Sequence, residues 1–505
     1  MKTKRNEPDG RDSRNLSRRS LLELAGLAAA GAALPFPSAF ALDLAQQEKA
    51  PKSSDSVMIP LSTYMSEAAN HPLPEEITEK VKHHILDTIA AMISGSTLLP
   101  GKRALEFAQA YGGSDTCTVV ASKFSRGAIE AAMTNGVLAH SDETDDSHSP
   151  SQSHPGCAVV PAALAAGEQF HISGTRFLRA VTLGYDIGCR ITMTLGGQQF
   201  EAESHWSTHS IAPLFGAAAA AGCAAGLDAQ QMRWMLGYTA HQSSGLGSWN
   251  RDTEHIQKAF HFGGMTARSG VTSALLVHSG WTGVDDIFSG KDNFFLAYNP
   301  KADASGLIDK LGERYEVART NIKKWPVGSP IQAALDALEL LRKQRPFTTG
   351  EVKQVDVRLA TDEAAIVNNR EIPDICLQHM LAVALLEKTV SFGSAHDVSK
   401  MKDPTVLRER VKINLIPDAE LERLMPLRVA IVDVTLTDGT HLRQRVDNVR
   451  GTPENPMTRD EVLAKARDLI TPVLGSEKCS ALLLKLLDLE RVTDIRSLRP
   501  LLQIS

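Results

Sequence analysis

Apolar positions follow a helical spacing from about Leu61 to about Gly312. The clearest stripe repeats every four residues, which places its members on one face of a helix. Its members are Ile77, Val81, Ile85, Ile89 and Ile93. Further Ala-rich helices are predicted over residues 128–140, 158–170, 177–192 and 215–226. This part of the chain is therefore predicted to form a large helical region.

The pattern changes after Trp325-Pro326, where polar and apolar residues begin to alternate. Alternation with a period of two is typical of half-buried strands. Such runs cover residues 354–360, 428–436 and 441–446, and Asp438-Gly439 predicts a hairpin between the last two. Helices are predicted at 330–342 and 374–387. Residues 322–457 are therefore predicted to form a compact α+β domain.

The end of the chain returns to a helical pattern. Thr458 is followed three residues later by Glu461, which is the spacing of a capping box at a helix start. Apolar periodicity then continues to the end of the chain. Residues 458–505 are accordingly predicted to be helical.

The N-terminus has the features of an export signal. Basic residues precede Ser17-Arg18-Arg19-Ser20-Leu21-Leu22, which resembles a twin-arginine signal, and an Ala-rich apolar run follows. Ala39-Phe40-Ala41 fits a cleavage site. We therefore expect a signal peptide over residues 1–41, a linker over 42–59, a periplasmic location, and no membrane span after cleavage. The alternative is an uncleaved membrane anchor.

Composition excludes several classes of protein. The chain has 505 residues, too many for a single core of about 100–200 residues. Its net charge of −5 argues against nucleic acid as a partner. The six cysteines are too few and too scattered for a disulfide scaffold, and none forms a C-x-x-C pair that would hold zinc or an iron–sulfur cluster.

A dense group of acids and histidines lies between the helices predicted at 128–140 and 158–170. It runs from His140 to His148 as HSDETDDSH and is followed by Ser153-His154-Pro155-Gly156. A solvated acidic loop, a metal site and a catalytic acid/base site are all compatible with this composition. The ligand spacing of a helical metal motif is missing, so metal is the weaker interpretation.

Two later segments favour an anion-binding pocket. Ser204-His205-Trp206-Ser207-Thr208-His209 precedes an Ala-rich helix, and helix N-termini attract anions. The segment from Lys258 to Arg268 adds two cations, His261 and a Gly-Gly pair. Each histidine alone is more often structural, but together they predict a pocket with several titratable groups.

These segments resemble the MmgE/PrpD family, which includes 2-methylcitrate dehydratase and cis-aconitate decarboxylase. The resemblance covers most of residues 60–500 and rests on NGVLAHSDETDDSHSPSQSHPG, HWSTHSIAPLFGAAAAAG, KAFHFGGMTARSG, IKKWP and RGTPENPMTRDEV. It implies a mainly α protein in which residues 60–321 and 458–505 form one large helical domain, with the smaller α+β domain between them. It also implies a homodimer that needs no cofactor, neither metal nor iron–sulfur cluster.

The family's site residues carry over with some departures. The leading aspartate of its acidic motif falls on Glu143, its threonine on Ser147 and its His-Pro on His154-Pro155. Its later histidine falls on His205, or on His209 with a shifted alignment. Its two basic positions fall on Arg268 and Lys323. The histidine of the decarboxylase branch falls on Gly328, and the tyrosine region reads Asp374–His379 without a tyrosine.

The residues and the resemblance together predict a lyase of the dehydratase type acting on a small di- or tricarboxylic acid. His154 or His205 is expected to take the proton beside a carboxylate, with Glu143 and Asp146 orienting the histidines and Ser147 bound to the substrate. Arg268 and Lys323 are expected to bind carboxylates. The rest of the substrate pocket is predicted to contain His209, Lys258 and His261. An isomerase or epimerase, a decarboxylase and a non-catalytic periplasmic carboxylate-binding protein remain alternatives.

Overall fold

The computed structural model describes residues 57–504. The predicted signal peptide at 1–41 and nearly all of the predicted linker at 42–59 lie outside the described residues, so both stay predictions. Within the described part of the chain, no helix combines the length and the apolar character needed to cross a membrane.

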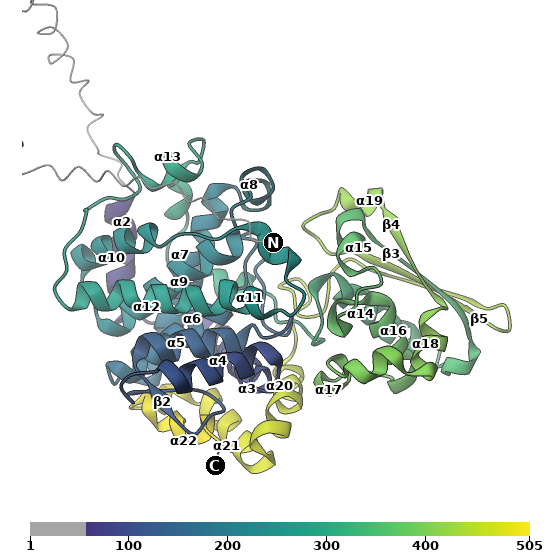
Figure 1. Cartoon of the computed structure of the whole chain (residues 1–505). Coiled ribbons are helices and arrows are strands. Elements are labelled where there is room, and N and C mark those ends of the chain that lie inside the picture. Colours follow the sequence, from purple (N-terminus) through teal and green to yellow (C-terminus); the bar gives the residue numbers. More distant parts are fainter. Residues whose placement is uncertain (1–56, 505) are drawn as a thin grey trace, which may run out of the picture. The chain divides into compact units, whose positions relative to one another are not determined.

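Long helices form the part of the chain that precedes Lys323, as the periodicity predicts (Figure 1). The predicted isoleucine stripe lies on α3, whose apolar face is buried. The helices are α2 (Met58–Glu67), α3 (Glu75–Gly95), α4 (Leu99–Tyr111), α5 (Ala128–Ala139), α6 (Gly156–Gln169), α7 (Gly174–Leu195), α8 (Gly197–Ser204), α9 (Thr208–Ala225), α10 (Ala229–His241), α11 (Ile256–Ala259), α12 (Met265–His278) and α13 (Phe294–Tyr298). A short ribbon pairs β1 (Cys117–Thr118) with β2 (Ser125–Arg126).

The Ala-rich helix α9 is the centre of this helical part. It packs against α6, α7 and α12 (Figure 1), and its residues from Ser210 to Ala224 are buried. Small residues are required because the backbones approach closely: a Cβ added to Gly188 on α7 would lie 2.5 Å from the carbonyl oxygen of Ala212. The helix begins at Thr208 and not at residue 215 as predicted, so His209 lies in its first turn.

The α+β part has a four-stranded sheet in the order β4-β3-β5-β6. Its strands are β3 (Val352–Ala360), β4 (Ile413–Asp418), β5 (Ala430–Leu436) and β6 (His441–Val446). Only β3 and β4 pair in parallel, and β5 and β6 form the predicted hairpin. The sequence pattern did not predict β4, which contains Pro417 and lies at the edge of the sheet, where proline is tolerated.

Helices pack on this sheet and complete the α+β part. Contacts join α14 (Ser329–Gln344) to β5 and β6, and α16 (Leu377–Glu387) to β4 (Figure 1). Helix α14 was predicted at 330–342. Helix α16 begins three residues later than predicted, because a 3₁₀ turn occupies Pro373–Ile375. Shorter helices are α15 (Thr361–Val367), α17 (Phe392–Ala395), α18 (Pro404–Arg410) and α19 (Ala419–Glu422).

The C-terminal helices share the hydrophobic core of the first helical part. They are α20 (Arg459–Leu474), α21 (Ser476–Leu487) and α22 (Arg499–Leu502), and α20 packs on α3. Thr458 caps α20 through the predicted capping box with Glu461. A second core lies between Trp325 and Val449. The fold is therefore mainly α with a smaller α+β part, as predicted, and all six cysteines are buried free thiols.

Candidate active site

The acidic loop between α5 and α6 is buried, and the interpretation as a solvated loop is therefore wrong. Residues 140–146 are each at most 6% exposed. Such burial is tolerated because each carboxylate meets a donor or a cation. The loop is also fixed through its backbone: Lys465 of α20 donates to the carbonyl oxygen of Thr144 at 2.9 Å, and Ser147 pairs with Asn321 as an antiparallel bridge.

Asp145 binds two imidazoles. Its carboxylate lies 3.0 Å from Nδ1 of His140 and 3.3 Å from Nδ1 of His154. Although burial alone raises the pKa of Asp145, the two histidines hold it well below its usual range. Burial lowers the pKa of His154, and the charge of Lys323 lowers it further against the attraction of Asp145. At neutral pH, His154 is therefore a neutral base beside a carboxylate.

Asp146 is engaged elsewhere, and the expectation that it orients the catalytic histidines is corrected. Its carboxylate accepts hydrogen bonds from Nδ1 of His84 at 2.8 Å, from the Tyr185 hydroxyl at 2.5 Å, and from the backbone N–H of Gly156 at 3.0 Å. These contacts join the loop to α3, α6 and α7. Asp146 is thus a structural anchor of the loop.

Glu143 also departs from its expected partners, because it contacts two lysines. The ammonium of Lys258 forms a short ion pair with its carboxylate, and that of Lys323 lies 3.6 Å from it. Lys323 also donates to the Glu143 carbonyl oxygen at 2.7 Å. Burial alone would raise the pKa of Glu143, but the charges of the two lysines keep it well below its usual range. The lysines are thereby brought together around one carboxylate.

Further imidazoles complete the cluster around Phe262. The Phe262 ring stacks with His140 at 4.4 Å and with His209 at 4.5 Å between ring centroids. His209 also lies 5.5 Å from His154. Burial lowers the pKa of His209 well below its usual value, and lowers that of His261 to about 4. His209 and His261 are therefore uncharged at neutral pH.

The α+β part supplies an ion pair to the same loop. Nε2 of His396 lies 3.0 Å from the carboxylate of Asp142 and 3.8 Å from that of Asp374, while Nδ1 donates to the Phe392 carbonyl oxygen at 2.9 Å. Acceptors at both ring nitrogens require an imidazolium. Against the effect of burial, Asp142 and Asp374 raise the pKa of His396 to about 9. Burial raises the pKa of Asp374 to about 6.

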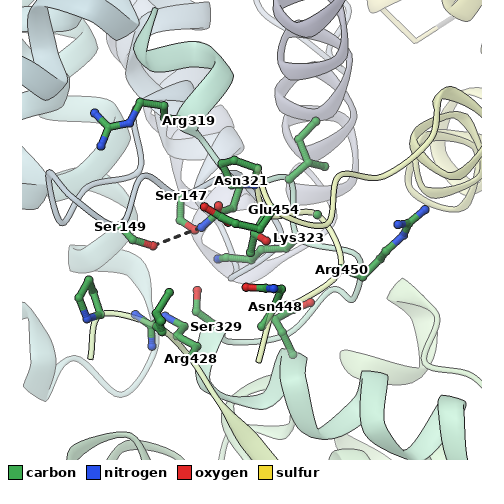
Figure 2. Close-up of a pocket in the computed structure, with 18 of the residues that line it drawn as sticks. Ser147, Ser149, Arg319, Asn321, Lys323, Ser329, Arg428, Asn448, Arg450 and Glu454 are labelled. Atoms are coloured by element: carbon green, nitrogen blue, oxygen red, sulfur yellow. Dashed lines mark hydrogen bonds between the residues drawn. The ribbon is translucent and has the colours of Figure 1, made fainter. Parts of the chain in front are cut away.

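A cavity of about 210 Å³ adjoins this cluster and is lined by Ser147 and Lys323 (Figure 2). Ser329, from the first turn of α14, and Asn321 line it as well. The guanidinium groups of Arg319 and Arg450, two further lining residues, are directed away from its centre in Figure 2. The cavity and the histidine cluster meet at Lys323, which makes this cavity the candidate substrate site.

The structure separates two predicted site residues from the rest. His205 is exposed at the end of α8 with a positive φ of 64°, and His209 takes the inward position instead. The Arg268 guanidinium lies 5.9 Å from the ring of Phe260, a residue that is 38% exposed, and no described contact joins Arg268 to the cluster. Lys258 is the cation that this segment contributes. The expectations for His205 and Arg268 are corrected accordingly.

Several residues of the cluster were not predicted. His255 has a positive φ of 61° and lies 5.2 Å from His140, and burial with the charge of Lys258 lowers its pKa to about 3. Trp249 lies 5.0 Å beneath the ammonium of Lys258. His396 binds Asp142 although the two residues lie far apart in the sequence. No periodicity or short motif signals any of these three.

Two groups of side chains could share a metal ion. One is His140, Asp145 and His154, and the other is His140, Glu143 and His255. Imidazole and carboxylate suit several divalent ions. In the second group the carboxylate is already paired with Lys258 and Lys323, and a metal ion would have to compete with those charges. Metal independence stays a prediction.

Comparisons with known proteins identify the family of this chain. The family model of the MmgE/PrpD N-terminal domain matches residues 60–306, and the family model of the MmgE/PrpD C-terminal domain matches residues 325–489. Cis-aconitate decarboxylase of Aspergillus terreus is 24% identical, over 87% of this chain and 94% of its own length. The human protein of the same name is 26% identical, over 85% of this chain and 91% of its own. The mouse protein of that name is 24% identical, over 86% of this chain and 90% of its own length.

Both family domains are matched in order, and together they cover most of the chain. The acidic loop, the lysine of the Gly-Gly segment and Lys323 lie in one site. The chain is an enzyme of the MmgE/PrpD family.

Proposed function

We propose that this enzyme is a lyase that removes a proton beside a carboxylate of a small di- or tricarboxylic acid. The observation that carries the proposal is the position of His154, a neutral imidazole whose Nδ1 faces Asp145 while Lys323 lies close enough to influence its pKa. A proton on Nδ1 leaves the Nε2 lone pair free to act as a base.

The cations would stabilise the charge that builds up on the substrate. Removal of a proton next to a carboxylate produces an enolate-like transition state, and fixed positive charges at that point lower its free energy. Lys323 lines the cavity and Lys258 lies on the same carboxylate of Glu143. Ser147 also lines the cavity and would hydrogen-bond the substrate.

His154 alone can carry out both proton transfers of a dehydration. Nε2 takes the proton from carbon, the electron pair of that C–H bond forms the double bond, and the C–O bond breaks. The imidazolium then returns its proton to the departing hydroxide, which leaves as water. Asp145 favours the imidazolium because its carboxylate lies beside the ring.

Decarboxylation is the second candidate, because the relatives reported above are named cis-aconitate decarboxylases. In that reaction the bond between carbon and a carboxylate breaks, carbon dioxide leaves, and the electron pair left on the substrate takes up a proton, which a protonated His154 would donate. Where the resemblance places the histidine of the decarboxylase branch, this chain has Gly328, which precedes α14 and donates through its backbone N–H to the Asp374 carbonyl oxygen at 3.0 Å.

The test is His154→Ala, assayed with a panel of hydroxy- and unsaturated polycarboxylic acids. We expect kcat to fall by about 10²–10⁴-fold, the usual cost of removing a positioned acid/base group. Ultraviolet absorbance of the new double bond reports dehydration, and released carbon dioxide reports decarboxylation. His278→Ala, at the end of α12, is the control.

The same assay in D₂O separates the remaining alternatives. Deuterium incorporated at carbon without loss of water or carbon dioxide would favour an isomerase. Tight binding without any exchange would favour a binding protein. EDTA is included, so that a metal-dependent reaction would be recognised by loss of activity. Full turnover by His154→Ala would contradict the proposal.

A further inference from the structure

The carboxyl group of Glu201 lies beside the histidine cluster, although it has no role in the lyase mechanism. Helix α8 ends at His205, whose left-handed conformation (φ 64°) turns the chain before α9 begins at Thr208. As a result, the Glu201 carboxyl lies 2.9 Å from the Thr208 hydroxyl and 4.0 Å from Nε2 of His209. These are the polar contacts of the Glu201 side chain within the described part of the chain. The turn therefore places an acid next to an imidazole of the cluster.

Glu201 is suited to exchange protons with solvent. Burial raises its pKa to about 7, although the hydrogen bond with Thr208 opposes this shift. The Thr208 hydroxyl also lies 2.7 Å from the carbonyl oxygen of Gln152, and it has a single hydrogen for the two acceptors. A proton on Glu201 satisfies the second contact, because the carboxyl can then donate to the hydroxyl oxygen. The side chain is 22% exposed, so this proton can pass to water.

His209 connects Glu201 with the cluster. Its Nε2 is the ring nitrogen near Glu201, while its Nδ1 is buried and has no hydrogen-bond partner among the described residues. The ring lies 5.5 Å from that of His154, between ring centroids. The charged or titratable groups that lower its pKa, in addition to burial, are His154, Lys258, His140 and His261. His209 is therefore a neutral ring that can take up a proton at one nitrogen and release one from the other.

The two candidate reactions differ in their need for protons from solvent. In dehydration, the proton taken from carbon leaves in the water molecule, so the site returns to its starting state. In decarboxylation, each turnover consumes one proton, which His154 donates to carbon and must then regain. The His154 side chain is 9% exposed, so water has little direct access to it. A neighbouring group that supplies the proton is therefore an advantage in decarboxylation.

We propose that Glu201 and His209 form a proton path that connects His154 with solvent. A proton passes from water to the Glu201 carboxyl, then to Nε2 of His209, and His209 releases its Nδ1 proton to Nε2 of His154. One bridging water spans each gap that is too long for a direct hydrogen bond. The inference rests on the proposed function, because the path serves the base assigned there. Glu201 acts through His209 and not on the reacting atoms.

Nuclear magnetic resonance of the protein labelled with ¹⁵N-histidine tests the path, with solvent protons as the probe. Saturation transfer from water measures how fast the imidazole N–H of His209 exchanges, and His209→Ala identifies its signal. Glu201→Gln removes the ionisable group and nearly keeps the shape. In this variant we expect the exchange at about pH 7 to slow by about tenfold or more. An unchanged rate would overturn the inference.

Glu203→Gln is the matched control, because Glu203 lies on the same helix and the substitution changes the net charge by the same amount. Glu203 is exposed, and its carboxylate accepts a hydrogen bond from Gln199 at 2.8 Å. We expect the exchange rate of His209 to stay within about twofold of the native value. Equal slowing in both variants would assign the effect to long-range charge and contradict the path.

The pH dependence of this exchange separates a proton carrier from a structural residue. In the native protein the rate should change its slope near pH 7, where Glu201 changes its protonation state, and in Glu201→Gln this inflection should be lost. The native series also decides the matter if the variant does not fold. A native rate that shows no inflection near pH 7 would count against the path.

Turnover gives an independent measurement. For an acid of the panel that is decarboxylated, kcat of Glu201→Gln should fall by about tenfold. For an acid that is dehydrated, kcat should stay within about twofold, because the reaction returns its own proton. Decarboxylation at the native rate in this variant would contradict the path. The exchange measurement needs no substrate, so failure of the path leaves the lyase proposal standing, and the reverse also holds.

Discussion

Residues 140–148 and residues 204–209 are both rich in histidine and hydroxyl side chains, but only the first segment is buried along almost its whole length. It lies between α5 and α6, and α3, α20 and the α+β part each contribute a partner to it. The second segment has helix α8 on one side and the start of α9 on the other, and His205 is exposed. Polar composition alone therefore does not identify a site; the surrounding elements do.

The largest expected effect comes from removing the anchor of the buried loop. Asp146→Ala leaves the donors of His84, Tyr185 and Gly156 without their common acceptor in a region excluded from water. We expect the free energy of unfolding to fall by about 3 kcal/mol or more, as for other broken buried polar networks. Urea denaturation followed by circular dichroism measures it.

The control for Asp146→Ala lies in the other segment. Glu203→Ala removes an exposed carboxylate of α8 and should change the free energy of unfolding by less than about 0.5 kcal/mol. Similar losses in both variants would show that the two segments differ less than their burial indicates.

The next effect concerns the ion pair between the loop and the α+β part, and it depends on pH. The pKa of His396 is raised from 6.5 to about 9 in the folded protein, mainly by Asp142 against the effect of burial. The stabilisation is therefore complete below about pH 6.5 and is lost as the pH rises through about 9. At pH 6.5, His396→Asn should lower the free energy of unfolding by about 2 kcal/mol.

Urea denaturation of both proteins at pH 6.5 and pH 9.5 checks this sign. The difference between the native protein and His396→Asn should be largest at pH 6.5 and small at pH 9.5. Asp374 titrates lower, with a pKa raised to about 6 by burial, so it contributes little to the change between these two values. An equal difference at both pH values would rule out the charged pair.

The smallest effect sharpens the comparison within the second segment. His209 stacks on Phe262 and faces His154, so His209→Ala should lower kcat by about tenfold through a disturbed base. His205→Ala should leave kcat within about twofold, because its side chain is exposed. Steady-state assays of the two variants measure both. A larger loss of kcat in His205→Ala than in His209→Ala would instead support His205 as the active histidine, as the resemblance first suggested.

Elements with local signals were predictable from the sequence. The isoleucine stripe of α3, the Asp438-Gly439 hairpin and the capping box at Thr458 each depend on residues a few positions apart. Strand β4 was not predicted because it is a short edge strand that contains a proline. Its pairing with β3 is a tertiary contact, which no local pattern encodes.

The site was predicted in part, for the same physical reason. His154, Glu143 and Lys323 belong to motifs, and the structure brings them together. His396 and His255 reach the site through tertiary folding and have no neighbouring signal. Arg268 was placed in the site by the resemblance, but no described contact joins it to the cluster. It follows a π-helical turn at Phe260–Gly264, and Lys258, which precedes that turn, pairs with Glu143 instead.

The ring of Phe262, which lies in that π turn, has a consequence for proton transfer in the site. It stacks with His140 and with His209, and it offers neither a proton nor a lone pair. A phenyl ring in this position therefore blocks direct proton transfer between the two imidazoles. A proton taken up by one of these two imidazoles during turnover therefore cannot reach the other through this ring.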